Sequence, residues 1–255
     1  MRTDVGLEVE LEDSKVLIDF LVDNINISKT RLKKCIQIGA VWLVDGDHRQ
    51  RMRKATSRIQ EGDIIEVFYD DARLDSKAIA CELIEDCEEY SVWYKPQGIP
   101  MQGDDFGDHH CVSRQLEFAR KGLPYWPITL PSDAQSGLFL LAHSRKMASV
   151  LNDLLNSGQI ESTLLVTLEG DIDASAIDFC TAQKISFQNA VNQTRMAMLI
   201  KTDVHGLTKT CSANPSFQII QETDDKEQLA TQEISLRKIA FTCPISKEQK
   251  VFESP

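Results

Sequence analysis

Apolar residues recur at helical spacing near the start of the chain. Val16, Leu17, Phe20 and Leu21 lie one, three or four positions apart. This spacing places them on one side of a helix, so the pattern predicts a short amphipathic helix that ends near residues 24–26.

A second helix is predicted directly after the first. Ser28 belongs to the residue types that cap helix N-termini, and Gly39 to the type that ends helices in a left-handed conformation. These two signals predict a helix over Lys29–Ile38. Leu32 and Ile36 would face inward, and most of the lysines would lie on the opposite side.

Strands are expected after this helix. Val41–Val44 predicts one strand, Asp45-Gly46 a tight turn, and Asp63–Tyr69 another strand, with a loop rich in arginine between them. Trp42 stands in the middle of the first strand, where a core position is expected, although an indole could also stack on a base.

The clearest buried strand lies in the second half of the chain. The run Leu138–Ala142 is wholly apolar and too short for a helix. A polar loop that carries Asp133 and then Ser136-Gly137 leads into it. A carboxylate at the entry to a packed strand is held rigidly, which makes Asp133 a candidate catalytic residue.

Other segments predict a mixture of helices and strands. Residues 147–155 have the spacing of a core-facing helix, and residues 112–119 that of a shorter helix. Residues 91–95 predict a strand that leaves through a loop containing Pro96 and Gly98. The expected fold class is therefore α+β.

The charge of the chain is unevenly distributed. The 255 residues carry a formal net charge of −11, which by itself argues against a nucleic-acid partner. Ser28–Arg58, however, contains nine basic and two acidic residues, a local charge of +7 that leaves −18 for the remainder. Phosphate contacts depend on local density of cations, so a basic RNA-binding module attached to an acidic body is predicted.

The sequence gives no sign of a membrane span, a signal peptide or a metal centre. No window reaches the roughly 20 apolar residues of a membrane span. The seven scattered cysteines show no C-x-x-C spacing, so reduced thiols and a cytoplasmic location are expected. The segment Asp104–Cys111, which contains His109 and His110, could suggest a metal, but adjacent ligands rarely converge on one ion and no second cluster supplies partners, so no metal is expected.

The basic segment resembles a known RNA-binding module. The order of basic helix, Gly39, strand, Asp45-Gly46 and Gly62-Asp63 across Lys15–Tyr69 is similar to the domain first seen in small-subunit ribosomal protein S-four. The resemblance implies that the helix and the following loop bind the phosphates of structured RNA. The candidate RNA-binding residues are Lys29, Arg31, Lys33, Lys34, Arg49, Arg51 and Arg53. A solvated basic helix face is the alternative.

The second half resembles the RluA-type RNA pseudouridine synthases. Ser136-Gly137 followed by the apolar run matches the end of their first signature, and Lys95-Pro96-x-Gly98 matches the second. Ile160–Gly170 matches a strand that ends in Glu-Gly, and Phe252 and Pro255 match the C-terminal Phe-x-x-Pro. The residues that would frame the cleft are Lys95, Gly98, Ser136, Gly137 and Leu164.

The resemblance implies an isomerase that needs no metal and no cofactor, with an altered active site. Aligned without a gap, the family's Arg and its catalytic Asp fall on Leu130 and Ser132. One deleted residue puts Asp133 in the place of the nucleophile, and Leu164 replaces the Tyr that stacks on the base. Misplacement by even ~1 Å can cost on the order of a hundredfold in rate, so weak or absent activity is expected.

Two functions remain open. The chain is either a pseudouridine synthase acting on structured, ribosomal or other, RNA, or a catalytically inactive scaffold that binds RNA or a ribosomal particle. The expected domains are 1–76, an S-four-like module, and 91–255, a synthase-like domain, joined by a linker at 77–90. A monomer is assumed.

Overall fold

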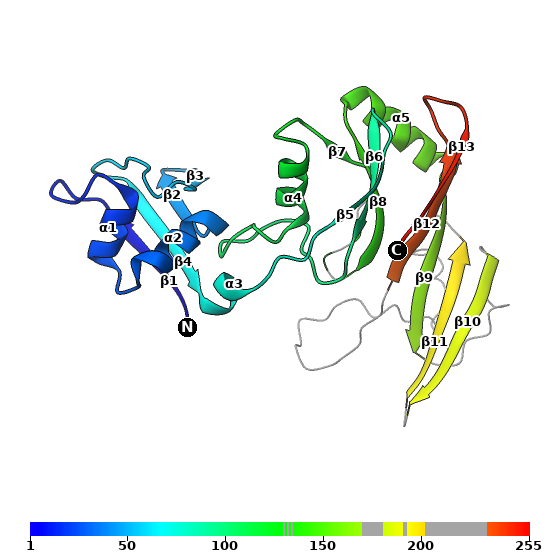
Figure 1. The fold of residues 1–255 in the computed structure, drawn as a ribbon, viewed down its shortest axis with the longest axis horizontal. Helices are drawn as coiled ribbons and strands as arrows, with labels where there is room; N and C mark the ends of the chain where they lie inside the picture. The colour runs from blue at the N-terminus through cyan, green and yellow to red at the C-terminus, as the bar shows by residue number, and fades with distance from the viewer. Residues whose placement is uncertain (130, 132, 134, 170–180, 191–192, 202–233) are drawn as a thin grey trace. The chain divides into compact units, whose positions relative to one another are not determined.

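The computed structural model describes residues 1–129, 131, 133, 135–169, 181–190, 193–201 and 234–255 (Figure 1). The chain divides into two compact units, described separately below. Unit 1 comprises Met1–Ala80 and Pro100–Lys121, and unit 2 comprises Cys81–Ile99 and Gly122–Pro255. Helices and mixed sheets occur together, which confirms the α+β class. Pro100–Lys121, which the sequence assigns to the second domain, groups with unit 1, and the predicted domain boundaries stay predictions.

Unit 1 is built on a four-stranded sheet in the order β1-β4-β2-β3, all antiparallel. Its core joins residues of two helices to those of the sheet, among them Leu17, Phe20, Leu32, Ile36 and Ile65. The elements are β1 (Arg2–Glu8), α1 (Leu17–Asn24), α2 (Lys29–Ile38), β2 (Val41–Asp45), β3 (His48–Arg51), β4 (Ile64–Asp70), α3 (Asp71–Asp75) and α4 (Val112–Ala119).

Both predicted helices of the basic module are present with their predicted ends. Ser28 accepts a hydrogen bond from the backbone N–H of Arg31, and Gly39 ends α2 with a φ of 81°. Leu32 and Ile36 are fully buried, as the periodicity predicts. Local signals therefore define α2, because each of them acts within one turn of the helix.

Two strands of unit 1 were not predicted. β1 alternates between exposed and half-buried residues, as expected for a strand with one face toward the sheet core, but its acidic composition obscures that pattern. β3 reads His-Arg-Gln-Arg and has no apolar alternation. The prediction that Arg49, Arg51 and Arg53 lie in a loop is therefore wrong for Arg49 and Arg51, which lie in β3. Arg53 lies two residues after the end of this strand.

Unit 2 contains a nine-stranded sheet among the described residues. Seven strands follow the order β10-β11-β9-β12-β8-β6-β5, while β13 pairs with β12 and β7 with β8. The elements are β5 (Glu82–Asp86), β6 (Tyr90–Lys95), β7 (Trp126–Pro127), β8 (Ser136–Ala142), α5 (Arg145–Asn156), β9 (Glu161–Glu169), β10 (Thr181–Ala190), β11 (Gln193–Lys201), β12 (Ile234–Thr242) and β13 (Gln249–Glu253).

The core of unit 2 lies around β8. Leu138 and Leu140 are fully buried and belong to one cluster with Leu151 of α5 and Ile239 of β12. This confirms the prediction of a buried strand and a core-facing helix, and Figure 1 shows α5 beside these strands. None of the helices in the described part of the chain has the length and apolar character that a bilayer crossing requires.

Candidate functional site

The outward face of α2 carries the first group of candidate RNA-binding residues. Lys29, Lys33 and Lys34 are exposed because the apolar positions of the helix face the core. Lys29 pairs with Asp19 at 2.7 Å, and Lys34 lies 3.6 Å from Asp75. Within the described ranges, Lys33 makes no ion pair. All three ammonium groups are thus exposed, but Lys29 and Lys34 each lie beside a carboxylate, while Lys33 is the open cation of this helix within the described residues.

Arg31 is more strongly neutralised than these lysines. Its guanidinium lies 3.1 Å from the Asp75 carboxylate and 3.2 Å from that of Asp71. The hydrogen bond with Asp75 raises the pKa of Arg31 and lowers the pKa of Asp75. Both carboxylates belong to α3, so Arg31 links α2 to α3.

Arg49 and Arg51 lie on β3 and flank the ring of Trp42 on the neighbouring strand. Their guanidinium carbons lie 4.2 and 4.0 Å from the centre of the indole. Trp42 is half-buried and donates a hydrogen bond from its indole N–H to the backbone carbonyl of Asp105 at 3.2 Å. The expectation that Trp42 is a core residue is wrong. It is the centre of a cation–π cluster on the sheet.

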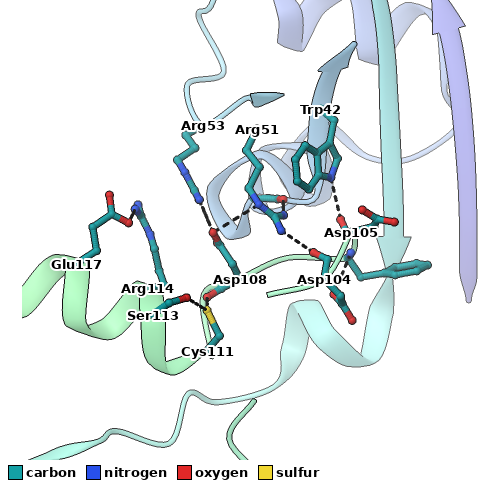
Figure 2. Close-up of polar contacts among 12 residues, drawn as sticks. Trp42, Arg51, Arg53, Asp104, Asp105, Asp108, Cys111, Ser113, Arg114 and Glu117 are labelled. Carbon is teal, nitrogen blue, oxygen red and sulfur yellow. Dashed lines mark hydrogen bonds and ion pairs between the residues drawn. The ribbon is translucent and has the colours of Figure 1, made fainter. Parts of the chain in front are cut away.

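Arg49, Arg51 and Arg53 all pair with carboxylates of one segment, Asp104–Asp108. Figure 2 shows the pairs of Arg51 and Arg53 with Asp108. Arg49 binds Asp105 at 2.6 Å and also binds Glu66. Arg53 binds Asp108 through both terminal nitrogens, one of them at 3.1 Å, and Arg51 Nε lies 3.6 Å from the same carboxylate. We call Asp104–Asp108 the acidic loop.

Backbone contacts fit the acidic loop closely to the C-terminal end of α2. The Asp108 N–H donates to the Ile38 carbonyl at 2.9 Å. A Cβ at Gly39 would lie 2.8 Å from Arg53 Nη1 and 2.9 Å from Asp108 Oδ1, so these side chains would have to shift to admit it. Gly107, with a φ of 133°, would bring a Cβ to 2.9 Å from the Ile38 carbonyl oxygen. The loop is therefore a packed part of unit 1.

Burial is deepest at the pair formed by Arg51 and Asp108. Their side chains are 15% and 13% exposed, against 46% for Asp105. Burial lowers the pKa of Arg51, and the Asp108 carboxylate opposes that effect. A half-buried guanidinium without its carboxylate would be costly, so this pair holds the loop more firmly than the outer pairs do.

The sequence missed the role of these aspartates. For Asp104–Cys111, the sequence raised only the possibility of a metal site, and none was expected. Among the described residues, the structure shows no group of three or more His, Cys, Asp or Glu side chains that could hold a metal ion. The rings of His109 and His110 stack with centres 3.7 Å apart. The one sequence signal of the loop's role was its acidity, in a chain that also contains the strongly basic segment Ser28–Arg58.

In unit 2 the sheet aligns the segments that carry the sequence signatures. Lys95 of β6 lies opposite Gly137 of β8, Gly137 opposite Leu236 of β12, and Leu236 opposite Leu164 of β9. Four strands far apart in the chain therefore meet in one row. Leu164 is placed by its backbone register alone.

Gly137 is required at this row for a steric reason. Its φ is 143°, and a Cβ would lie 2.5 Å from the backbone nitrogen of Leu236. The neighbouring Ser136 donates a hydrogen bond from its hydroxyl to Ser235 Oγ at 3.1 Å. The Ser136-Gly137 pair thus allows β8 and the parallel strand β12 to approach closely.

Lys95 is fully buried and holds the loop before β8. Its ammonium donates to the backbone carbonyls of Asp133 at 2.9 Å and Gln135 at 2.6 Å, and more weakly to that of Pro96 at 3.4 Å. Burial lowers the pKa of Lys95, while the nearby Asp133 carboxylate opposes this shift. The cleft-framing candidate Lys95 is thus a cation placed close to the candidate catalytic Asp133.

The remaining candidates in this region are less constrained. Asp133 is exposed, and Gly98 has a φ of 79° with no atom within 4 Å of an added Cβ. Leu130 and Ser132, on which the ungapped alignment places the family's Arg and Asp, lie outside the described residues.

No model of a known protein family matches the chain, and no curated protein matches it. Among solved structures, the chain is similar to Human RNA Pseudouridylate Synthase Domain Containing 4, with 11% identity over 68% of this chain and 88% of that one, and a TM-score of 0.45. It is similar to Human RNA Pseudouridylate Synthase Domain Containing 1 (12% identity, 69% and 83% covered, TM-score 0.45). It is also similar to a structure described as a pseudouridylate synthase (17% identity, 93% and 96% covered, TM-score 0.36).

Proposed function

We propose that this chain is an RNA-binding protein of the pseudouridine synthase type, acting on uridine in structured RNA through an altered active site. The observation that carries the proposal is the row Lys95–Gly137–Leu236–Leu164, which unites three sequence signatures in one sheet. Lys95 at the start of this row binds the loop that carries Asp133.

The chemistry asks for a carboxylate, a cation and a surface for the detached base. Isomerisation breaks the bond between the ribose and the uracil nitrogen, turns the base and forms a bond to carbon, without a net change in composition. Asp133 would act as the nucleophile or base. The buried ammonium of Lys95, which binds the Asp133 carbonyl, would supply the nearby positive charge in place of the arginine that the signature lacks.

RNA binding is assigned to the basic face of unit 1. Lys29, Lys33 and Lys34 are exposed on α2 and can reach phosphates without changing the core. Arg31 lies on the same helix, and Arg49, Arg51 and Arg53, which lie in or just after β3, would extend this face. Local positive charge of this density favours phosphate contacts despite the acidity of the whole chain. We further propose that the bound RNA is ribosomal and that the N-terminal module is of the S-four type.

The location that fits this function is the cytoplasm. Cys35, Cys87, Cys111 and Cys243 are free thiols, as a reducing compartment would maintain.

The experiment is a pseudouridine assay on unmodified ribosomal RNA transcripts incubated with purified protein. We expect wild type to form pseudouridine and Asp133→Asn to form none, with Asp153→Asn on the exposed side of α5 as the matched control. A signal unchanged by Asp133→Asn would exclude Asp133 as the catalytic group.

The second candidate function is a catalytically inactive RNA-binding scaffold. Leu164 favours it, because an aliphatic residue stands where the signature places the stacking ring. In that case no pseudouridine forms on any transcript, while salt-sensitive RNA binding persists. The same preparations distinguish the two functions when binding and modification are measured together.

A further inference from the structure

The acidic loop supplies carboxylates at the positions where a bound RNA would supply phosphates. Asp105 pairs with Arg49 and Asp108 with Arg53, at donor–acceptor distances that suit charge-assisted hydrogen bonds. The Asp104 carboxylate pairs with Arg73 of α3, which lies outside the proposed RNA-binding residues. Arg51 adds a hydrogen bond to the Asp104 carbonyl at 2.8 Å. The arginine side of the proposed RNA-binding face is therefore already occupied by anions of the same chain (Figure 2).

The aromatic groups of this face are covered as well. Phe106 packs edge-on against Phe68 with ring centres 5.4 Å apart, and Trp42 donates its indole N–H to the loop backbone. Aromatic rings beside arginines are the groups on which unpaired bases stack. The loop thus occupies both kinds of group that an RNA strand would use.

We infer that the acidic loop is a displaceable internal competitor of RNA, which closes the arginine side of the basic face and leaves the lysines of α2 open. This inference rests on the proposed RNA binding by unit 1. RNA would first meet Lys29, Lys33 and Lys34, and its phosphates would then replace the carboxylates on Arg49, Arg51 and Arg53. Only an RNA whose phosphates reach both the lysines of α2 and the arginines beneath the loop would displace the loop. The loop therefore selects folded RNA over short single strands.

The ion pairs of Asp104 and Asp105 are more exposed, and therefore weaker, than those of Asp108. The Asp104 and Asp105 side chains are 51% and 46% exposed, and exposed ion pairs contribute little to stability. Asp108 is 13% exposed and is tied to α2 by a backbone hydrogen bond. Opening would therefore begin at Asp104 and Asp105, with Asp108 released last.

The first test compares RNA affinity in two variants that lose the same charge. Asp105→Asn with Asp108→Asn removes the loop carboxylates that pair with Arg49, Arg51 and Arg53. Glu12→Gln with Asp23→Asn removes two exposed carboxylates elsewhere in unit 1. We expect the loop variant to bind a structured ribosomal transcript at least about fivefold more tightly than wild type, with a salt slope steeper by about one to two. Equal affinities of the loop variant and the control variant would overturn the inference.

A coupling measurement assigns the effect to the arginines. Arg49→Gln should weaken RNA binding little in wild type, where Asp105 and Glu66 both neutralise Arg49, and several-fold more in the loop variant, where Glu66 alone remains. An identical effect of Arg49→Gln in both backgrounds contradicts competition between the loop and RNA.

Hydrogen exchange of the unmutated protein tests displacement directly and does not depend on how the variants fold. The amides of Asp104, Gly107 and Asp108 each donate a backbone hydrogen bond in the closed loop. Saturating RNA should raise their exchange rates, and slower exchange would show that the loop stays closed beneath the RNA. If neither wild type nor the loop variant binds RNA, the proposed function fails. If both bind equally, only the loop inference fails.

Discussion

Single residues decide how closely the strands and loops of both units can pack. Gly39, Gly107 and Gly137 all have positive φ values, and a Cβ on any of them would clash with neighbouring atoms. Gly107 and Gly137 mark places where one backbone approaches another, while at Gly39 the near atoms belong to the side chains of Arg53 and Asp108. At Gly137 that approach joins β8 to β12, which places the row of signature residues within one sheet.

Gly137→Ala is expected to destabilise unit 2. The new Cβ would lie 2.5 Å from the Leu236 nitrogen, and the φ of 143° is strained for any L-residue. We expect a loss of more than ~2 kcal/mol in the free energy of unfolding. Urea unfolding followed by circular dichroism measures it. Gly6→Ala in β1, which has no atom within 4 Å of an added Cβ, is the control and should change stability by less.

His109 predicts a dependence of stability on pH. Burial, together with the neighbouring His110, lowers the pKa of His109 to about 4 in the folded state. An unfolded histidine titrates near ~6.5, so the unfolded chain binds more protons between these values. The neutral His109 therefore contributes stability that is fully present above pH ~6.5 and is lost as the pH falls toward ~4.

Urea unfolding of wild type and His109→Gln at about pH 7.5 and about pH 5 tests this prediction. Because the ring is only half-buried, we expect wild type to lose about 1 kcal/mol more than the variant over this interval. Equal losses in the two proteins would show that other groups cause the pH dependence.

At the scale of elements, prediction succeeded where the signals were local. α2 was predicted to its ends because Ser28, Gly39 and the apolar spacing all lie within or beside it. β8 was predicted because its continuous apolar run identifies a buried strand without knowledge of the strands that pair with it. β3 was not predicted, since His48–Arg51 owes its strand geometry to pairing with β2 rather than to its own composition.

The pairing of elements far apart in the chain could not be predicted. Arg53 and Asp108 are separated by 55 residues, and no pattern in either segment indicates the other. Likewise, Lys95 and Gln135 lie 40 residues apart. The signature residues were identified by resemblance. That Lys95 of β6 lies beside the Asp133 loop follows only from the folded structure.

Lys95→Met is expected to release the loop that carries Asp133. The methionine fills a similar volume but removes hydrogen bonds to the carbonyls of Asp133 and Gln135. Removing the buried charge also removes its desolvation cost, which offsets part of the loss of these hydrogen bonds, so we expect the free energy of unfolding to change by less than ~2 kcal/mol. Pseudouridine formation should fall on the order of a hundredfold.

Hydrogen exchange of residues 133–137 and the pseudouridine assay check the two parts of this prediction. The control is Lys146→Met, which removes an exposed ammonium of α5. Full activity with a loosened loop would show that Lys95 acts only on structure.

At the scale of the whole molecule, charge is arranged in opposing segments. Ser28–Arg58 carries +7 within a chain of net −11, and part of the acidic excess lies directly on the basic residues. Net charge alone would therefore give the wrong expectation for binding. The open cations of α2, rather than the total charge, should set the encounter with RNA.

Charge reversal at Lys33 tests that expectation. Lys33 is exposed, and among the described residues it makes no ion pair, so Lys33→Glu removes an open phosphate contact without breaking an internal one. We expect weaker binding to a structured transcript between about 50 and 200 mM salt, with a salt slope reduced by about one. Lys146→Glu on α5 makes the same change in net charge and should leave affinity nearly unchanged. If both variants weaken binding equally, RNA responds to the total charge of the chain and not to the basic face of unit 1.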